Sequence, residues 1–461
     1  MYEIDFRKPA NIHFLGIGGI SMSALAEILL KRGFKISGSD DKKSTLTKKL
    51  AMEGCSIHIG LTADNITDDI DAVVYTAAIR PGNSEYDECV RRQLPMLTRA
   101  ELLGQIMNNY DTAIGVSGTH GKTSTTSMLT EILLYADTDP TISVGGMLSS
   151  IGGNLRIGNS QIFLTEACEY TNSFLSFKPT MNIILNVEED HLDFFKDIND
   201  IRLSFKKYTE LLPSDGTLII NSAIDDYEYF YKDSDCKVVT FGMDNKSDFS
   251  AKDIKVDEHG HFSYTLLYKN EAVCDINLKV SGEHNVCNSL AAIAAAVSLG
   301  IEPATAAQGI SNYTGVDRRF QIKGKCNGFT IVDDYAHHPT EIEATLKAAK
   351  AFPGKKVWCI FQPHTYTRTK AFLPEFAKAL SLADHVILAK IYEAREKDIY
   401  GVSSDDLKKL IDAKGTPCEY FKEFTQIEQF VLNNCQEGDL VITMGAGDVY
   451  EVGNHLLSVT V

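Results

Sequence analysis

The stretch that decides the fold is GVSGTHGKTSTT, at residues 115–126. The apolar run at 112–116 predicts a short buried strand, and residues 125–136 carry apolar side chains at helical spacing, which predicts a helix. A glycine-rich loop that joins a strand to a helix and ends in Gly-Lys-Thr is typical of a phosphate-binding loop. We therefore expect a nucleotide phosphate site here.

The chemistry expected of this loop comes from three kinds of group. Backbone N–H groups and the helix N-terminus hold the anion, Lys122 adds a point charge, and the Thr123 hydroxyl reaches Mg²⁺. The spacing departs from the strict eight-residue pattern, because Val116 stands where that pattern has Gly, and Gly118 offers a shorter version. The alternative is a glycine-rich turn with a solvated Lys122.

Size and charge narrow the class of protein. The 461 residues suffice for about three domains, and 44% apolar with 23% charged residues is typical of an ordinary globular chain. The net charge of −17 argues against nucleic acid or an anionic membrane as a partner. The ten cysteines form no C-x-x-C pair, and the charged N-terminus lacks a signal-peptide core. We expect a cytoplasmic protein with reduced thiols and no membrane span.

The N-terminal part reads as strand 11–15, the turn GIGGISM at 16–22, helix 23–31 and strand 34–37, followed by Asp40. This order resembles the dinucleotide-binding fingerprint, in which an acid about 20 residues on binds a ribose. Ser21 replaces the third glycine of the fingerprint. Without the rest of the chain, an NAD-dependent oxidoreductase would be the obvious interpretation.

Two strands of the central region end in acidic residues. A strand at 162–165 ends on Glu166, and a strand at 182–187 precedes the run EEDHLD. Ligands bind at the carboxyl ends of parallel strands, so Glu166 and His191 are candidate metal ligands near Thr123, although His is an unusual ligand for Mg²⁺. The alternatives are a carboxylate at a helix N-terminus for Glu166 and, for His191, a loop histidine bonded to a neighbouring Asp.

The segment 215–280 reads as short strands and predicts a β-rich extension without visible chemistry. An Ala-rich helix is expected at 289–299. His284 and Asn288 precede it, and we expect them on opposite sides of its first turn. The alternative is that Asn285 or Asn288 is simply the N-cap of this helix.

The C-terminal part alternates strands at 329–332, 356–361, 385–390 and 440–444 with helices, which predicts a doubly wound sheet. Polar turns at 333–339 and 362–369 follow two of these strands and mark a functional face. The alternatives are strand-end solvation with N-capping for the Asp pair at 333–334, and turn polarity for the His pair at 337–338. The predicted domains are 1–109, 110–316 and 317–461.

Five strings occur in order along the chain: GIGGISM from 16, GTHGKT from 118, GEHN from 282, DRRF from 317 and DDYAHHP from 333. Together they resemble the Mur ligases over the whole length. The resemblance implies a three-domain α/β fold. A Rossmann-like N-terminal domain binds a UDP-sugar, a P-loop central domain with a β-rich extension binds ATP, and a Rossmann-like C-terminal domain admits an amino acid.

The activity implied by the resemblance is ATP-dependent amide-bond formation with Mg²⁺ as cofactor. L-alanine is joined to the lactyl carboxylate of UDP-N-acetylmuramate through an acyl phosphate, in peptidoglycan precursor synthesis. Alternatives are ligation of a recycled murein tripeptide to the same sugar nucleotide, a nicotinamide-dependent dehydrogenase built on residues 11–40, and a non-catalytic nucleotide-sensing module. A monomer or a homodimer is expected.

The resemblance also implies roles for individual residues. The ATP-binding group is Gly118, Thr119, His120, Gly121, Lys122, Thr123, Ser124, His284, Asn288, Arg319 and Asp334. The UDP-sugar group is Gly16, Gly18, Gly19, Ser21, Asp40 and Thr76. The metal group is Thr123, Glu166 and His191, and the catalytic group is Lys122, His191, Tyr335, His337 and Arg368, of which the last three orient L-alanine and the acyl intermediate.

Two positions depart from the family pattern. Thr365 stands where relatives often carry Arg, which leaves Arg368 as the carboxylate-binding charge of that turn. Several relatives use a carbamylated Lys near position 205, and Phe205 holds that place here although Lys206 and Lys207 follow it. The sequence therefore does not lead us to predict a carbamylated lysine.

Overall fold

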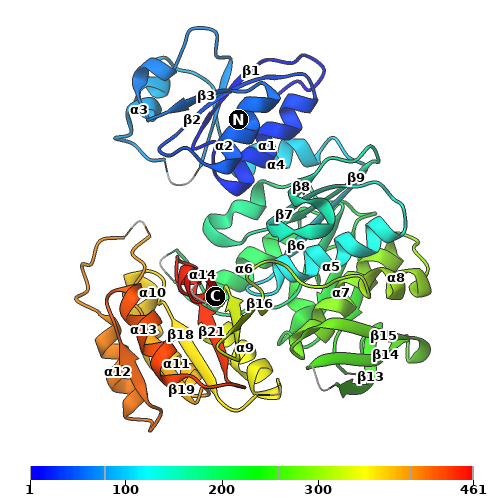
Figure 1. Ribbon diagram of the computed structural model, residues 1–461. Helices are drawn as coiled ribbons and strands as arrows, with labels where there is room; N and C mark the ends of the chain where they lie inside the picture. The colour runs from blue at the N-terminus through cyan, green and yellow to red at the C-terminus, as the bar shows by residue number, and fades with distance from the viewer. Residues whose placement is uncertain are drawn as a thin grey trace.

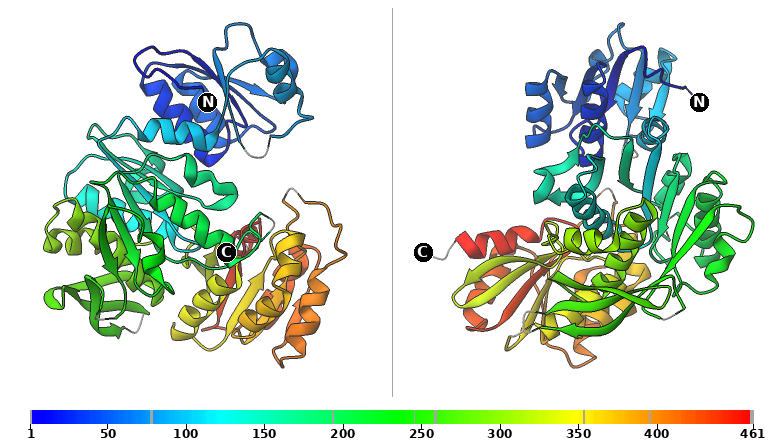
Figure 2. Two further views of the ribbon diagram at one scale, coloured as in Figure 1. Left: turned by 180° about the vertical axis from the view of Figure 1, so that it is seen from behind. Right: turned by 90° about the vertical axis from the view of Figure 1, so that its right-hand side faces the viewer.

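Three separate β-sheets form the framework of the chain, and each is built from its own stretch of sequence (Figure 1). The structure, a computed structural model, describes residues 2–76, 79–192, 194–244, 246–257, 260–352, 354–394 and 396–458. The N-terminal lobe sits on one end of the central lobe, and the C-terminal lobe lies along another side of it (Figure 2). Each of the two outer lobes therefore meets the central one.

The N-terminal sheet has five parallel strands in the order β3-β2-β1-β4-β5. Its strands are β1 Asn11–Leu15, β2 Lys35–Asp40, β3 Ser56–Ile59, β4 Ala72–Tyr75 and β5 Met96–Thr98. Its helices are α1 Ile20–Lys31, α2 Thr45–Glu53, α3 Ser84–Arg91 and α4 Arg99–Met107, with the 3₁₀ turn η1 Ala63–Asn65. The strand order reverses between β1 and β4, so the turn after β1 lies at the switch point, where ligands of such sheets bind.

The central sheet has ten strands in the order β15-β14-β13-β12-β11-β10-β6-β9-β7-β8. Its strands are β6 Thr112–Ser117, β7 Thr141–Leu148, β8 Gly153–Arg156, β9 Ile162–Glu166, β10 Met181–Ile184, β11 Thr217–Asn221, β12 Lys237–Phe241, β13 Phe249–Val256, β14 His261–Tyr268 and β15 Glu271–Ser281. Strand β6 pairs in parallel with both β9 and β10. Of the β-rich extension predicted at 215–280, β11 and β12 instead continue the parallel part of the sheet, and β13 to β15 add antiparallel pairs at its end.

The helices of the central domain place the phosphate loop. They are α5 Lys122–Tyr135, α6 Ile198–Thr209, α7 His284–Ser298 and α8 Pro303–Ile310, with 3₁₀ segments η2 Ser149–Ile151, η3 Tyr170–Ser176 and η4 Tyr227–Phe230. Helix α7 is buried along most of its length, because its alanines let α5 and the strands β11 to β13 approach closely. This packing brings the first turn of α7 beside the loop that precedes α5.

The C-terminal sheet has the order β16-β17-β21-β18-β19-β20, with β16 antiparallel to the others. Its strands are β16 Gln321–Cys326, β17 Phe329–Asp334, β18 Val357–Phe361, β19 His385–Leu388, β20 Cys418–Tyr420 and β21 Leu440–Met444. Its helices are α9 Pro339–Ala351, α10 Tyr366–Ala371, α11 Leu373–Leu380, α12 Ser404–Asp412, α13 Phe424–Asn434 and α14 Tyr450–Ser458. The turns after β17 and β18 flank β21 at the sheet's carboxyl edge.

The predicted fold class, a three-domain α/β chain with a β-rich extension of the central sheet, is confirmed. We retain 1–109, 110–316 and 317–461 as proposed domain limits. Strand β4 ends at Tyr75, and residues 77 and 78 lie outside the described part. In the described residues, no helix is both long enough and apolar enough to cross a membrane.

Candidate active site

The phosphate loop, residues 118–121, joins buried strand β6 to helix α5. Gly118 and Gly121 have φ angles of +143° and +82°, a region that favours glycine. A Cβ would also lie 2.9 Å from the Leu185 Cβ at Gly118 and 2.7 Å from Asn288 Oδ1 at Gly121. No side chain caps the first turn of α5 in the described structure. Its N–H groups are therefore available to an anion.

A side chain that follows β10 clamps the loop. Asn186 Oδ1 accepts a hydrogen bond from the His120 N–H at 2.8 Å, and Asn186 Nδ2 donates to the His120 carbonyl at 3.1 Å. The Glu188 N–H donates to Thr119 Oγ1 at 2.9 Å. Asn186 falls inside the strand expected from sequence and was not among the predicted residues. The loop thus has its shape before any ligand binds.

Lys122 is enclosed rather than solvated, so the alternative of a solvated side chain is wrong. Its side chain is 17% exposed, and its Nζ donates to the carbonyls of Gly118 and Thr119 and to both carboxylate oxygens of Glu169, the nearer at 3.0 Å. Burial by itself would lower the pKa of Lys122, but the Glu169 charge raises it above its ordinary value. Lys122 therefore stays a cation at the mouth of the loop.

Two of the three predicted metal ligands meet. Thr123 Oγ1 donates to Glu166 Oε2 at 3.1 Å, and Glu166 Oε1 accepts from the Gly145 N–H at 2.6 Å. The alternative for Glu166, a plain helix N-terminal carboxylate, does not describe these contacts. Within the described residues, His191 makes no hydrogen bond or ion pair with Thr123 or Glu166; its Nε2 lies 3.8 Å from Glu169 and 3.7 Å from Asp190.

The oxygen atoms of Thr123 and Glu166 suit Mg²⁺ better than a metal whose ligands all come from protein side chains. Mg²⁺ takes one or two carboxylates and completes its shell with water and phosphate oxygens. Among the described residues there is no cluster of three or more His, Cys, Asp or Glu side chains suited to a metal. Thr123 and Glu166 therefore fit a Mg²⁺ ion that a nucleotide brings with it.

A cavity of about 610 Å³ opens between the central and C-terminal domains. This volume is in the usual range for a nucleotide-sized ligand. Seven of the predicted ATP residues line it: His120, Gly121, Ser124, His284, Asn288, Arg319 and Asp334. The loop, the first turn of α7 and the start of the C-terminal domain thus share one cavity.

One expectation about helix α7 is wrong. His284 and Asn288 both line the cavity instead of lying on opposite sides of the first turn. The helix begins at His284 with Glu283 as its N-cap, so the two residues are four apart within the helix and share a face. The alternative that Asn285 or Asn288 caps the helix is wrong for the same reason.

Asp334 ends strand β17 beneath the cavity. It is 6% exposed, accepts hydrogen bonds from the N–H groups of Phe320 and Ala336, and burial raises its pKa to about 6. Its neighbour Asp333 is also buried and pairs with Arg318 Nε at 3.1 Å. The alternative of strand-end solvation is therefore wrong for both carboxylates.

The turn after β17 holds a neutral histidine. His337 Nδ1 lies 3.0 Å from the Tyr335 carbonyl oxygen and 3.3 Å from Glu341 of helix α9, and burial lowers its pKa to about 3. The Tyr335 ring contacts the guanidinium of Arg319 at 5.3 Å. His338 is buried and is the N-cap of α9, so it is more than a polar turn residue.

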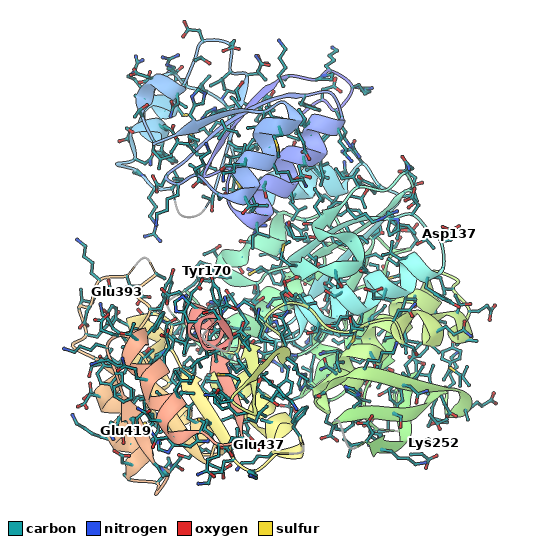
Figure 3. The ribbon with its side chains drawn as sticks, viewed as in Figure 1. Asp137, Tyr170, Lys252, Glu393, Glu419 and Glu437 are labelled. Atoms are coloured by element: carbon teal, nitrogen blue, oxygen red, sulfur yellow. The ribbon has the colours of Figure 1, made fainter. Side chains whose placement is uncertain are left out.

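Arg368 connects the C-terminal domain to the central one. Its Nη2 donates to Asp190 Oδ1 at 2.9 Å, with both side chains about one-tenth exposed. Burial would raise the pKa of Asp190, but the Arg368 charge holds it well below its ordinary value. Both residues line a second cavity of about 160 Å³ with His191 and Tyr170. Figure 3 labels Tyr170 on the side of the central domain that faces the C-terminal domain.

Thr365, at the second cavity, has a φ angle of +63°, which is unusual for a β-branched residue. This φ angle marks Thr365 as a strained residue. Lys206 and Lys207 are not part of either cavity: Lys206 pairs with Asp233 and Lys207 is exposed. Phe205 is fully buried.

The predicted UDP-sugar residues gather at the switch point of the N-terminal sheet. The Gly18 N–H donates to Asp40 Oδ2 at 2.9 Å, and a Cβ on Gly16 would lie 2.9 Å from the Thr76 methyl. Gly19 is the N-cap of α1. Ser21, in the first turn of α1, accepts a hydrogen bond from Arg99 Nη1 at 3.0 Å. All six predicted residues thus lie at the carboxyl ends of β1, β2 and β4.

Sequence reasoning missed the partners of the predicted groups. Glu169 pairs with Lys122, Glu341 with His120 and His337, and Asp190 with Arg368. Glu169 had a signal, because it follows Glu166 by three residues just after a buried strand. Glu341 had one as well, as an acid in the first turn of a helix.

Comparison with known proteins covers the whole chain. Residues 11–111 match the model described as "Mur ligase family, catalytic domain", residues 116–296 the Mur ligase middle domain, and residues 318–447 the "Mur ligase, glutamate ligase domain". A relative from Lachnospira eligens, named UDP-N-acetylmuramate–L-alanine ligase, is 61% identical over 99% of this chain and 100% of its own length. The chain belongs to the Mur ligase family. The resemblance predicted from five sequence strings is confirmed.

Two solved Mur ligase structures are similar to this one. The UDP-N-acetylmuramate–alanine ligase of Thermotoga maritima has a TM-score of 0.82 at 28% identity, over 97% of this chain and 98% of its own. A murein peptide ligase of Psychrobacter arcticus has a TM-score of 0.73 at 26% identity, over 97% and 98%. The names of these two structures correspond to the predicted activity, alanine ligation, and to its alternative, peptide ligation.

Proposed function

We propose that this Mur ligase joins L-alanine to the lactyl carboxylate of UDP-N-acetylmuramate, with ATP converted to ADP and phosphate. The full-length match to relatives named for this reaction is the observation that carries the proposal. The reaction belongs to peptidoglycan precursor synthesis, and we place it in the cytoplasm, in keeping with ten free cysteines. Whether the enzyme is a monomer or a homodimer stays a prediction.

The chemistry needs two transfers. The lactyl carboxylate attacks the γ-phosphorus of ATP and ADP leaves; the amine of L-alanine then attacks the acyl carbon of the acyl phosphate and phosphate leaves. Lys122 and the N–H groups at the start of α5 would bind the phosphates and offset the charge that develops on them. A Mg²⁺ ion held by Thr123 and Glu166 would add further positive charge at this place.

The amino group of L-alanine must reach the acyl carbon as the neutral amine and not as the ammonium ion. His337 is neutral at pH 7, because burial lowers its pKa to about 3, and it can accept a hydrogen bond from the amine without repelling it. Arg368 supplies a charge for the carboxylate of the amino acid. The cavity of about 160 Å³ around Arg368 suits one alanine better than a tripeptide.

A ligation assay tests the proposal. The purified protein is incubated with ATP, Mg²⁺ and UDP-N-acetylmuramate, and with either L-alanine or the tripeptide L-alanyl-γ-D-glutamyl-diaminopimelate. We expect phosphate release and a UDP-sugar product heavier by one alanine residue. No phosphate should be released when UDP-N-acetylmuramate or L-alanine is omitted. A clear preference for the tripeptide would overturn the choice of substrate.

The same assay separates the remaining alternatives. A nucleotide-sensing module would bind ATP without releasing phosphate in the complete mixture. A dehydrogenase would change nicotinamide absorbance. It would have no use for Lys122, whose side chain is held here by Glu169. Either result would contradict the proposed ligation.

A further inference from the structure

Arg99 is a cation without an acidic partner. Its Nη1 donates to the hydroxyl of Ser21 at 3.0 Å, and this is its only side-chain hydrogen bond within the described part of the chain. It forms no ion pair with a described residue, whereas Arg91 and Arg92 of the same domain both pair with Glu88. Burial lowers the pKa of Arg99 from its ordinary value. A guanidinium has five N–H donors, so most of its hydrogen-bonding capacity is unused.

Enclosing such a cation has a cost. Removing a charged group from water is unfavourable unless an opposite charge and further hydrogen bonds compensate it. A neutral serine hydroxyl compensates little of this. An uncompensated arginine in a half-buried position therefore points to an anion that is a ligand rather than a part of the chain.

The position of Arg99 narrows the choice of anion. It begins helix α4, which lies at the junction of the N-terminal and central domains (Figure 1). On one side it touches Ser21, in the first turn of α1 beside the predicted UDP-sugar loop. Asn154 of the central domain donates to the Ile20 carbonyl at 3.0 Å, which fixes the two domains against each other at this point.

The helix that begins at Arg99 also reaches the phosphate-loop network. Helix α4 packs against the segment Tyr170–Ser176, which directly follows Glu169. Glu169 is the partner of Lys122. Arg99 therefore begins a helix that contacts both the turn expected to hold the sugar nucleotide and the segment next to the partner of the lysine expected to hold the transferred phosphate.

We propose that Arg99 binds the lactyl carboxylate of the sugar nucleotide and positions it for attack on the γ-phosphate. The inference rests on the proposed function, in which this carboxylate is the one group of the sugar nucleotide that must approach ATP. Two anions repel each other at that distance, and a guanidinium beside the carboxylate reduces this repulsion. Its planar fork also fixes the orientation of the carboxylate.

Binding measurements with two sugar nucleotides test the proposal. UDP-N-acetylglucosamine lacks the lactyl group but keeps the diphosphate and the rest of the sugar. Titration calorimetry compares both ligands on the wild type and on Arg99→Ala. We expect Arg99→Ala to weaken UDP-N-acetylmuramate binding by about 30-fold, the usual scale for a charged hydrogen bond, and to leave UDP-N-acetylglucosamine binding within about twofold.

Two further variants complete the design. Arg91→Ala removes the same charge from an exposed position of the same domain, and we expect it to change neither affinity. Arg99→Lys keeps the positive charge but lacks the planar guanidinium, so we expect an intermediate loss of affinity for UDP-N-acetylmuramate only. If Arg99→Ala does not fold, the result for Arg99→Lys decides the question.

Three results would overturn the inference: equal losses for both ligands, which would assign Arg99 to the diphosphate; no loss for either ligand; or a loss that Arg91→Ala reproduces. Failure of the proposed function is visible separately, because the wild type would then not join L-alanine to UDP-N-acetylmuramate.

Discussion

His120 of the phosphate loop lies between two carboxylates from different domains. Its Nε2 is 3.5 Å from Glu188 of the central domain, and its Nδ1 is 3.3 Å from Glu341 of helix α9. Burial alone would lower the pKa of His120, but the two carboxylates beside its ring raise it to about 9. At neutral pH this histidine is therefore a cation that links the loop to the C-terminal domain.

This link predicts a pH dependence. Because the folded pKa of about 9 is above the ordinary value of 6.5, the stabilisation is fully present below pH 6.5 and is lost as the pH rises through 9. We expect the ring proton of His120, assigned in NMR spectra by its absence in His120→Gln, to titrate with a midpoint near 9. A midpoint below 7 would show that the two carboxylates do not hold the proton.

At the scale of elements, helix α4 packs closely against the segment Tyr170–Ser176. A Cβ on Gly104 would lie 1.9 Å from the Ser176 carbonyl oxygen. Helix propensity favours Ala over Gly by about 1 kcal/mol, so local and tertiary preferences oppose each other here. A backbone atom cannot move aside easily, and the tertiary contact wins.

We therefore expect Gly104→Ala to lower the free energy of unfolding by about 3 kcal/mol, as overpacking does. Urea denaturation measures the change. Gly153→Ala is the matched control, because no atom lies within 4 Å of a Cβ built there, and its effect should stay within about 0.5 kcal/mol. A stabilising Gly104→Ala would mean that the helix propensity prevails.

The elements were largely predictable from sequence, because buried apolar strands alternate with amphipathic helices along the chain. The first and last residues of these elements were less predictable. Helix α5 begins at Lys122 instead of 125, because the left-handed Gly121 is its N-cap, and α7 begins at His284 instead of 289. That second shift of five residues is why His284 and Asn288 were placed on opposite sides.

The residues of the candidate site also differ in how far the sequence predicts them. Groups at the carboxyl ends of strands, such as Glu166 and Asp334, could be predicted, since these ends meet at one edge of a sheet. Pairs such as Asp190 with Arg368 could not, because they depend on how one domain packs against the next. Sequence spacing carries no information about which turn of one lobe faces which helix of another.

At the scale of the whole molecule, two ionic links between described residues join the central and C-terminal domains. They are Asp190 with Arg368 and His120 with Glu341. In each link both partners are about one-tenth exposed, so water screens them little. We infer that these links hold the nucleotide cavity in its closed shape.

Removing both links should open the molecule. For the double variant Asp190→Asn/Glu341→Gln we expect small-angle scattering to give a radius of gyration larger by about 1 Å on roughly 23 Å, with an unchanged circular dichroism spectrum. The control is Asp233→Asn/Glu343→Gln, which removes two carboxylates from pairs within single domains. An equal increase in both double variants would rule out a specific role for the interdomain links.

The central claim is that Lys122 acts on the phosphates of ATP while a separate lobe holds the sugar nucleotide. The most direct measurement follows ADP formation and UDP-N-acetylmuramate binding in one preparation of Lys122→Ala. We predict that ADP formation in the complete mixture falls by about 1,000-fold or more, because a transition-state charge is lost, while the dissociation constant for the sugar nucleotide changes by less than about twofold. Unchanged ADP formation in this variant would contradict the account.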